Sequence, residues 1–166
     1  MNLRPTPLRS FAAVAAICAA ITCSTTTAVA QDECSTAATI TNGLNGPFNM
    51  LIATSSPQNR HCAGGNDMDL WFRYVATCCG VFNVNNCTPN FSMDTSIEVY
   101  DGSGGCSNLR WIDCNANSCS WEASMNVPVV PGQILYVRVG TYLNGYTTGS
   151  FNLNVSCTPA SGGSPT

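Results

Sequence analysis

The sequence contains no lysine, and only 9% of its residues are charged. Beyond residue 30, four arginines face nine acidic residues, which gives this part of the chain a net charge of −5. The arginines are scattered along the sequence, at Arg60, Arg73, Arg110 and Arg138. Nucleic-acid binding requires clustered cations that displace counterions from phosphates, so we expect no nucleic-acid partner. The same charge balance disfavours anionic membranes.

Long apolar runs are also absent beyond residue 30, where no segment reaches the roughly 20 apolar residues that a membrane-spanning helix takes. Residues 1–30 contain one short apolar run, FAAVAAICAAI, between Arg9 and the small residues Ala28-Val29-Ala30. A basic start, a short apolar run and an A-x-A site are typical of a secretory signal peptide. We therefore expect residues 1–30 to be cleaved and the protein to be secreted, at the cell surface or in the periplasm, with no membrane insertion.

Beyond residue 30 no window of helical length shows a 3.6-residue hydrophobic period, and the dominant period is two. In FNLNVS, the apolar side chains of Phe151, Leu153 and Val155 alternate with polar ones. The same alternation occurs in residues 68–76, 80–86, 94–100 and 134–140. Period two, with turn residues between the segments, indicates short strands that have one face buried and one in water.

Such strands predict an all-β fold, an antiparallel, disulfide-braced β-sandwich of the jelly-roll kind, with a small barrel as the alternative closure. The segment DTSIEVYDGSGGCSNLRWIDCN predicts a strand at 94–100, a turn at 101–105 and a second strand at 109–114. The expected domain covers residues 31–157. The remaining residues, 158–166, have the Pro, Ser and Gly content of a flexible tail.

Cysteine is abundant beyond residue 30, and in an exported chain this density is typical of a disulfide framework. The connectivity stays open. Adjacent Cys78 and Cys79 are not expected to bond each other, because the resulting ring strains the peptide. Since the number of cysteines is odd, the free thiol is expected within that pair. A zinc site is the alternative, although His61 is the single histidine and no C-x-x-C occurs. The disulfide candidates are Cys34, Cys62, Cys78, Cys79, Cys87, Cys106, Cys114, Cys119 and Cys157.

Oxygen-bearing side chains gather around the ends of two predicted strands. Calcium takes about six to eight oxygen ligands from carboxylates, amides and the backbone. The alternative is that Asp and Asn form turns and cap strand ends here. Calcium is the one cofactor that the sequence indicates, and its candidate ligands are Asp94, Asp101, Asp113, Asn115 and Asn117.

Several aromatic residues fall on outward or loop positions of the predicted strands. Exposed rings stack on sugar faces or pack against protein partners. The alternative is that Trp111 or Trp121 fills an end of the core. The candidate ligand-binding residues are Tyr100, Trp111, Trp121, Tyr142 and Tyr146.

The sequence contains no convincing pair of nucleophile and base. His61, Asp94 and Ser103 occur in the order of a trypsin-like triad, but in DGSGG the aspartate and first glycine are exchanged relative to that family's motif. Glu98 and Asp113 could meet across neighbouring strands as a glycosidase pair, although nothing in the sequence marks a cleft. We therefore expect no catalytic residues and no enzyme.

Three segments, DLWFRYVATCCGVFNVNNC, DTSIEVYDGSGGCSNLRWIDCN and VVPGQILYVRVGTYLNGYTTGSFNLNVSC, resemble the bacterial pre-peptidase C-terminal domain in a cysteine-rich, exported form. The resemblance covers residues 69–157 well and 34–68 loosely. It implies a non-catalytic β-sandwich, some of whose relatives bind calcium, collagen or polysaccharide. Relatives often have acidic residues where this chain has Asn115-Ala116-Asn117, and this difference weakens the prediction of calcium.

Together these features predict a secreted, non-catalytic binding or adhesion module that recognises an extracellular glycan or protein. The alternatives are a structural component of the cell envelope, joined through the odd cysteine, and a small secreted hydrolase.

Overall fold

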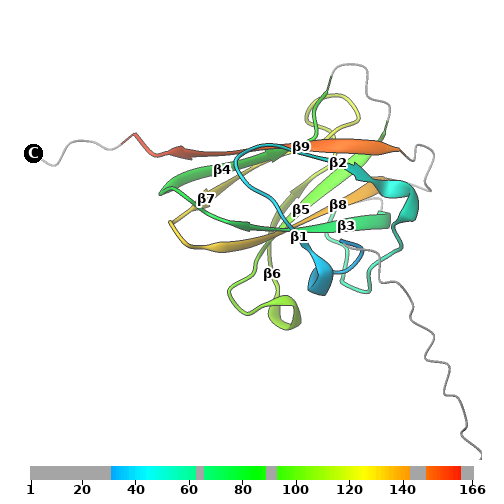
Figure 1. The fold of residues 1–166 in the computed structure, drawn as a ribbon, viewed down its shortest axis with the longest axis horizontal. Helices are drawn as coiled ribbons and strands as arrows, with labels where there is room; N and C mark the ends of the chain where they lie inside the picture. The colour runs from blue at the N-terminus through cyan, green and yellow to red at the C-terminus, as the bar shows by residue number, and fades with distance from the viewer. Residues whose placement is uncertain (1–30, 63–65, 89–92, 143–148, 162–166) are drawn as a thin grey trace, which may run out of the picture.

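The computed structural model describes residues 31–62, 66–88, 93–142 and 149–161 (Figure 1). The predicted signal peptide lies outside these residues. Within them, no helix has the length and apolar character needed to cross a membrane.

The described residues form two β-sheets that pack against each other, with three short 3-10 turns (Figure 1). The five-stranded sheet A has the order β1 (Ala38–Thr39), β3 (Asn66–Val75), β8 (Ile134–Tyr142), β5 (Thr95–Asp101) and β6 (Arg110–Asn115). The four-stranded sheet B has the order β2 (Gly43–Asn49), β9 (Ser150–Pro159), β4 (Gly80–Asn85) and β7 (Ser124–Val129). The 3-10 turns are η1 (Cys34–Thr36), η2 (Met50–Ile52) and η3 (Cys106–Asn108).

This arrangement confirms the predicted all-β sandwich. All strand pairs are antiparallel except β1 with β3, which run parallel. Most consecutive strands alternate between the two sheets, as in a jelly roll. Strands β5 and β6 lie within one residue of the predicted limits. Strand β9 continues to Pro159, so the first two residues of the predicted tail belong to the sheet, and the Ala160 N–H bonds to the Cys79 carbonyl.

The core lies between the sheets and contains the apolar residues that the alternation predicts. Leu70, Phe72 and Tyr74 of β3 are buried there, as are Phe82 and Val84 of β4. Burying a large apolar side chain contributes about 1.5 to 3 kcal/mol, so these inward rows hold the two sheets together. Strands β8, β5, β7 and β9 supply the same kind of inward row.

The prediction that the other face of each strand lies in water is wrong for the centre of sheet A. On its outer face, Trp71, Glu98 and Arg138 are fully buried. Residues 31–37 and 53–62 cover this face, as shown by hydrogen bonds such as those from the Trp71 N–H to the Gln31 carbonyl and from the Trp71 side chain to Ser56. An outer layer of chain therefore turns part of an outward face into a second buried region.

Four disulfides brace the sandwich. The bridges are Cys34–Cys106, Cys62–Cys114, Cys78–Cys157 and Cys87–Cys119. Cys79 is free and exposed, which confirms the prediction that the odd thiol belongs to the adjacent pair. Three of the four bridges end between residues 106 and 119, so η3, β6 and the loop that follows are fixed to three separate parts of the fold.

Candidate functional site

A row of side chains crosses the outer face of sheet A. Arg138 on β8 is paired with Trp71 on β3 and with Glu98 on β5, and Glu98 is paired in turn with Cys114 on β6. Directly opposed residues on neighbouring strands point to the same face of a sheet. The register therefore places Trp71 on one side of Arg138 and Glu98 on the other, with the disulfide-bonded Cys114 beyond Glu98.

Arg138 lies at the centre of this row and is fully buried. Its guanidinium donates two hydrogen bonds to the Asp69 carboxylate, at 3.0 and 3.2 Å. It also lies 3.6 Å from the Glu98 carboxylate, and donates to the carbonyl oxygens of Gln58 and Asn59. Removing one partner from a buried ion pair leaves an uncompensated charge, so each member of this cluster depends on the others.

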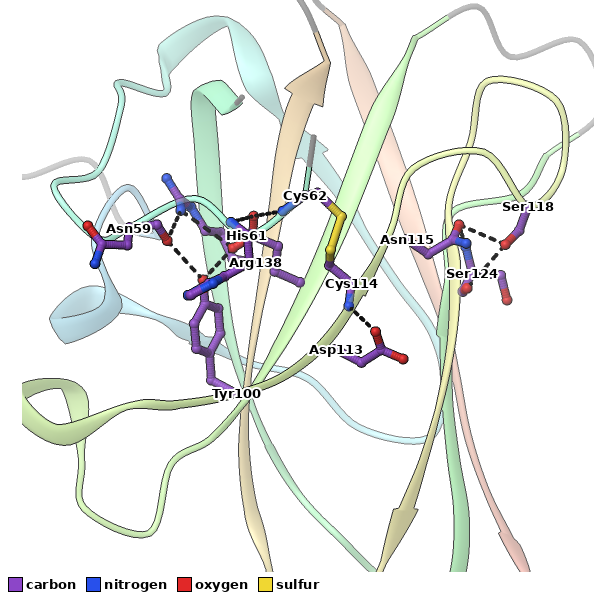
Figure 2. Close-up of a disulfide and its surroundings, with 11 residues drawn as sticks. Asn59, His61, Cys62, Tyr100, Asp113, Cys114, Asn115, Ser118, Ser124 and Arg138 are labelled. Carbon is purple, nitrogen blue, oxygen red and sulfur yellow. Dashed lines mark hydrogen bonds and ion pairs between the residues drawn. A yellow bond between two sulfur atoms is a disulfide. The ribbon is translucent and has the colours of Figure 1, made fainter. Parts of the chain in front are cut away.

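The cluster also holds the covering segment 53–62 in place. Asp69 accepts hydrogen bonds from the backbone N–H and the hydroxyl of Ser56, at 2.8 and 2.5 Å. Glu98 accepts the backbone N–H groups of His61 and Cys62, at 3.2 and 3.3 Å (Figure 2). Carboxylates on two strands thus bind the two ends of one loop, and their charge strengthens these hydrogen bonds.

Tyr100 completes the cluster from the end of β5. Its hydroxyl donates to Glu98 and points toward the carbonyl of Asn59 (Figure 2). Burial, followed by the hydrogen bond to the Glu98 carboxylate, raises the pKa of Tyr100 well above its ordinary value. Burial lowers the pKa of Arg138, but the hydrogen bonds and charge of Asp69, together with the charge of Glu98, outweigh it, so the pKa of Arg138 is raised overall. The phenol is therefore neutral and the guanidinium charged at physiological pH.

Aromatic rings connect this buried cluster to the surface at β6. Trp71 packs on Tyr100 with ring centroids 5.5 Å apart, and Tyr100 meets the edge of His61 at 5.9 Å. His61 then stacks on Trp111, with centroids 5.0 Å apart and an interplanar angle of 26°. Trp111 remains 45% exposed. We refer to His61 and Trp111 together as the aromatic edge.

The disulfide Cys62–Cys114 fixes the aromatic edge from one side. Cys62 follows His61 in the covering segment and is bonded to Cys114 (Figure 2). Cys114 lies on β6 together with Trp111. The bridge and the hydrogen bonds to Glu98 hold the His61 backbone close to the strand that carries Trp111. A ring that is held before binding loses less conformational entropy when a ligand packs on it. The aromatic edge is therefore a preorganised aromatic surface.

The other candidate ligand-binding residues do not join this edge. Trp121 is 59% exposed. Its carbonyl accepts the Thr95 N–H at the start of β5, whereas Trp111 is paired with Tyr100 near the end of that strand, so the two tryptophans lie near opposite ends of β5. The expectation that Tyr100 is exposed is wrong, because the covering segment buries it. Tyr146 and the side chain of Tyr142 lie outside the described residues.

The five candidate calcium ligands do not converge on one point. Asp94 precedes β5 and Asn115 is paired with Ile97 near that end, whereas Asp101 is the last residue of β5. Asp101 forms an ion pair with Arg110. The Ser103 N–H and the Arg110 guanidinium lower the pKa of Asp101.

The remaining candidates also have local roles. The Asp113 carboxylate accepts the Cys114 N–H, and Asn115 accepts the hydroxyl of Ser118 at 2.7 Å (Figure 2). Asn117 is exposed. A single calcium ion bound by all five residues is therefore ruled out by their positions. Calcium at the Asp94 and Asn115 end stays a prediction, which titration with calcium would test.

The residues weighed for catalysis occupy separate positions. The His61 ring contacts two aromatic rings, while Ser103 lies in the turn after β5, where its N–H bonds to Asp101. Glu98 shares a face with Cys114, so Asp113, the residue before Cys114, lies on the opposite face of the sheet from Glu98. The part of the chain that the structure describes encloses no pocket.

The fold and site define a disulfide-braced β-sandwich that has a preorganised aromatic edge on one sheet. No protein-family model and no curated protein matches the chain.

The sequence did not predict the buried cluster, although it contained a usable signal. Asp69, Glu98 and Arg138 share their predicted outward faces with the large aromatics Trp71 and Tyr100. Opposite charges mixed with large rings on adjacent strands are unusual for a solvated face, because large rings are seldom left in water. This combination indicates a face that another part of the chain covers.

Proposed function

We propose that the protein is a secreted, non-catalytic binding module whose aromatic edge recognises an extracellular polymer, either a polysaccharide or a protein. The observation that carries the proposal is the half-exposed Trp111 ring, supported by the stacked His61 and by a loop bound to Glu98 and Cys114. Rigid, partly exposed aromatic rings are common anchors in recognition surfaces. The four disulfides fit an extracellular protein. The resemblance to the pre-peptidase C-terminal domain agrees with this role.

Trp111→Ala is expected to weaken binding to a polymer ligand by about 10- to 30-fold, because truncating an anchoring tryptophan costs about 2 kcal/mol. A glycan and extracellular-matrix protein array would identify the ligand, and titration would measure the change. Trp121→Ala is the matched control, since Trp121 is also an exposed tryptophan but lies away from the aromatic edge. Equal losses in the two variants, or no ligand on the array, would contradict the proposal.

A second candidate function is a structural component of the cell envelope, joined to a partner through Cys79. The observation in its favour is that Cys79 is exposed and unpaired among the described cysteines. Non-reducing electrophoresis of the protein isolated from its own cells is expected to show a covalent species that Cys79→Ser abolishes. A monomeric band with one titratable thiol would dismiss this function.

A further inference from the structure

The outer face of sheet B differs from the rest of the molecule because it has no charge. The strands β2, β4, β7 and β9 contain no Asp, Glu, Lys, Arg or His, whereas every charged residue that lies in a strand belongs to sheet A. A typical protein has about a quarter of its residues charged, and most of them are at the surface. The two sheets thus divide the charge of the strands unequally.

Asparagine and serine take many of the outward positions on sheet B, beside the exposed apolar residues Leu44, Val81 and Pro128. In β4, Asn83 and Asn85 alternate with residues that face the core, and β7 and β9 repeat the pattern. None of these asparagines is buried, and Asn126 is exposed. We refer to this surface as the asparagine face, which consists of Asn83, Asn85, Asn126, Asn152 and Asn154 with Ser124 and Ser156.

The register places these side chains in rows. Asn83 is paired with Ser156 on one side and with Asn126 on the other. Two residues further along β4, Asn85 is paired with Asn154 and Ser124. Neighbouring strands lie about 4.8 Å apart, and successive outward residues on a strand about 6.7 Å apart. The face is therefore a regular array of amide and hydroxyl groups, bordered by the exposed apolar side chains of Leu44, which is paired with Asn154, and of Val81.

Hydrogen bonds between the amides fix the centre of the array. Asn85 donates to the Asn83 side-chain oxygen at 2.8 Å, and Asn83 donates to the Asn126 side-chain oxygen at 2.9 Å. The amide nitrogen of Asn126 and the side chains of Asn152 and Asn154 make no hydrogen bond to other described residues. The face therefore combines an ordered centre with donors and acceptors that remain open to a partner.

A face of this chemistry suits a neutral partner that is rich in hydroxyl groups. Covering a charged side chain costs much more than covering an amide that finds a new hydrogen bond, so a charge-free face avoids that penalty. An amide offers both donors and acceptors, as does a hydroxyl group. A polyanion or polycation would lose its own hydration at this face without meeting an opposite charge.

We propose that the asparagine face binds a neutral, polyhydroxylated polymer, a glycan chain without carboxylate, sulfate or amine groups. This surface is on the opposite side of the sandwich from the aromatic edge, and the proposal does not depend on the function of that edge. The alternative occupant is a second copy of the chain, whose own asparagine face has the same donors and acceptors.

The test uses the protein without residues 1–30 and measures how much of it binds to insoluble cellulose, chitin and starch. Carboxylated cellulose serves as the charged counterpart of cellulose. The variant Asn126→Asp with Ser156→Asp adds two charges beside Asn83 while leaving an acceptor at position 126. The matched control, Asn108→Asp with Ser107→Asp, makes the same substitutions at exposed positions of η3. Sedimentation velocity reports the oligomeric state.

We expect the protein to bind at least one of the three neutral polymers, and to bind carboxylated cellulose no better than cellulose. Raising the salt from about 0.1 to about 1 M should leave this binding unchanged, because screening acts only on charge. The asparagine-face variant should bind at least about tenfold more weakly, while the control binds as the unaltered protein does. Retention on none of the neutral polymers, an equal loss in the control, or a dimer that only the asparagine-face variant dissociates would overturn the proposal.

Discussion

Arg138→Ala is expected to lower the free energy of unfolding by about 3 to 5 kcal/mol, the cost of breaking a buried ion pair. The reason is that Asp69 and Glu98 would remain buried with no cation beside them, and the carbonyl oxygens of Gln58 and Asn59 would lose a donor. Denaturant unfolding with the disulfides intact would measure the change.

Arg110→Ala is the control for Arg138→Ala, because Arg110 is also an arginine of sheet A paired with an aspartate, but its side chain is 70% exposed. Exposed pairs contribute about 0 to 1 kcal/mol, so Arg110→Ala should change stability little. If Arg138→Ala does not fold, Arg138→Lys supplies the measurement, because it keeps the charge and loses the double contact with Asp69. A loss below about 1 kcal/mol for Arg138→Ala would contradict the structural role of the cluster.

Replacing Cys62 and Cys114 together by serine is expected to cost about 4 kcal/mol, given a bridge that spans 52 residues. Beyond that, this double variant should release the segment that carries His61 and leave Trp111 without its stacking partner. Hydrogen exchange should show faster exchange at the His61 and Cys62 amides, which bond to Glu98. Iodide should quench Trp111 fluorescence more strongly.

Serine at Cys87 and Cys119 is the comparison for that experiment, because this bridge spans 32 residues and closes a loop of the same order. The chain-entropy model gives it a nearly equal global cost, since closure entropy grows only with the logarithm of loop length. Protection of the His61 and Cys62 amides should persist in this variant. If both double variants expose those amides equally, the Cys62–Cys114 bridge has no special part in holding the aromatic edge.

The sequence was most informative where a strand has one buried face and one open face. Phe82 and Val84, or Phe151 and Val155, alternate with asparagine and serine, and the structure buries the apolar set and exposes the polar one. A period-two pattern identifies the residues that face the core when the outward positions are in water, because those positions are then polar and the inward ones apolar. The inward and outward residues of sheet B could therefore be predicted without knowing which other parts of the chain lie near it.

The outer face of sheet A was not predictable in the same way. Whether Glu98 or Arg138 meets water depends on residues 53–62, a segment that forms no strand or helix of its own. The path of such a segment is set by contacts distant in sequence, here with Asp69 and Glu98. The disulfide pairing could not be predicted either, because it too depends on contacts distant in sequence and cysteine spacing alone does not identify partners.

The cysteines of this chain pair without regard to the order in which they occur. Among the residues that the structure describes, no cysteine bonds the next one along the sequence, and Cys78 and Cys157 are bonded across 79 positions. If the thiols were oxidised in the order of synthesis, Cys34 would meet Cys62 first, and these two cysteines are not bonded to each other in the fold. From such a mispaired species the four bridges are reached by thiol–disulfide exchange, which an isomerase accelerates. Oxidative refolding of the reduced chain is therefore expected to yield more mispaired species without an isomerase than with one.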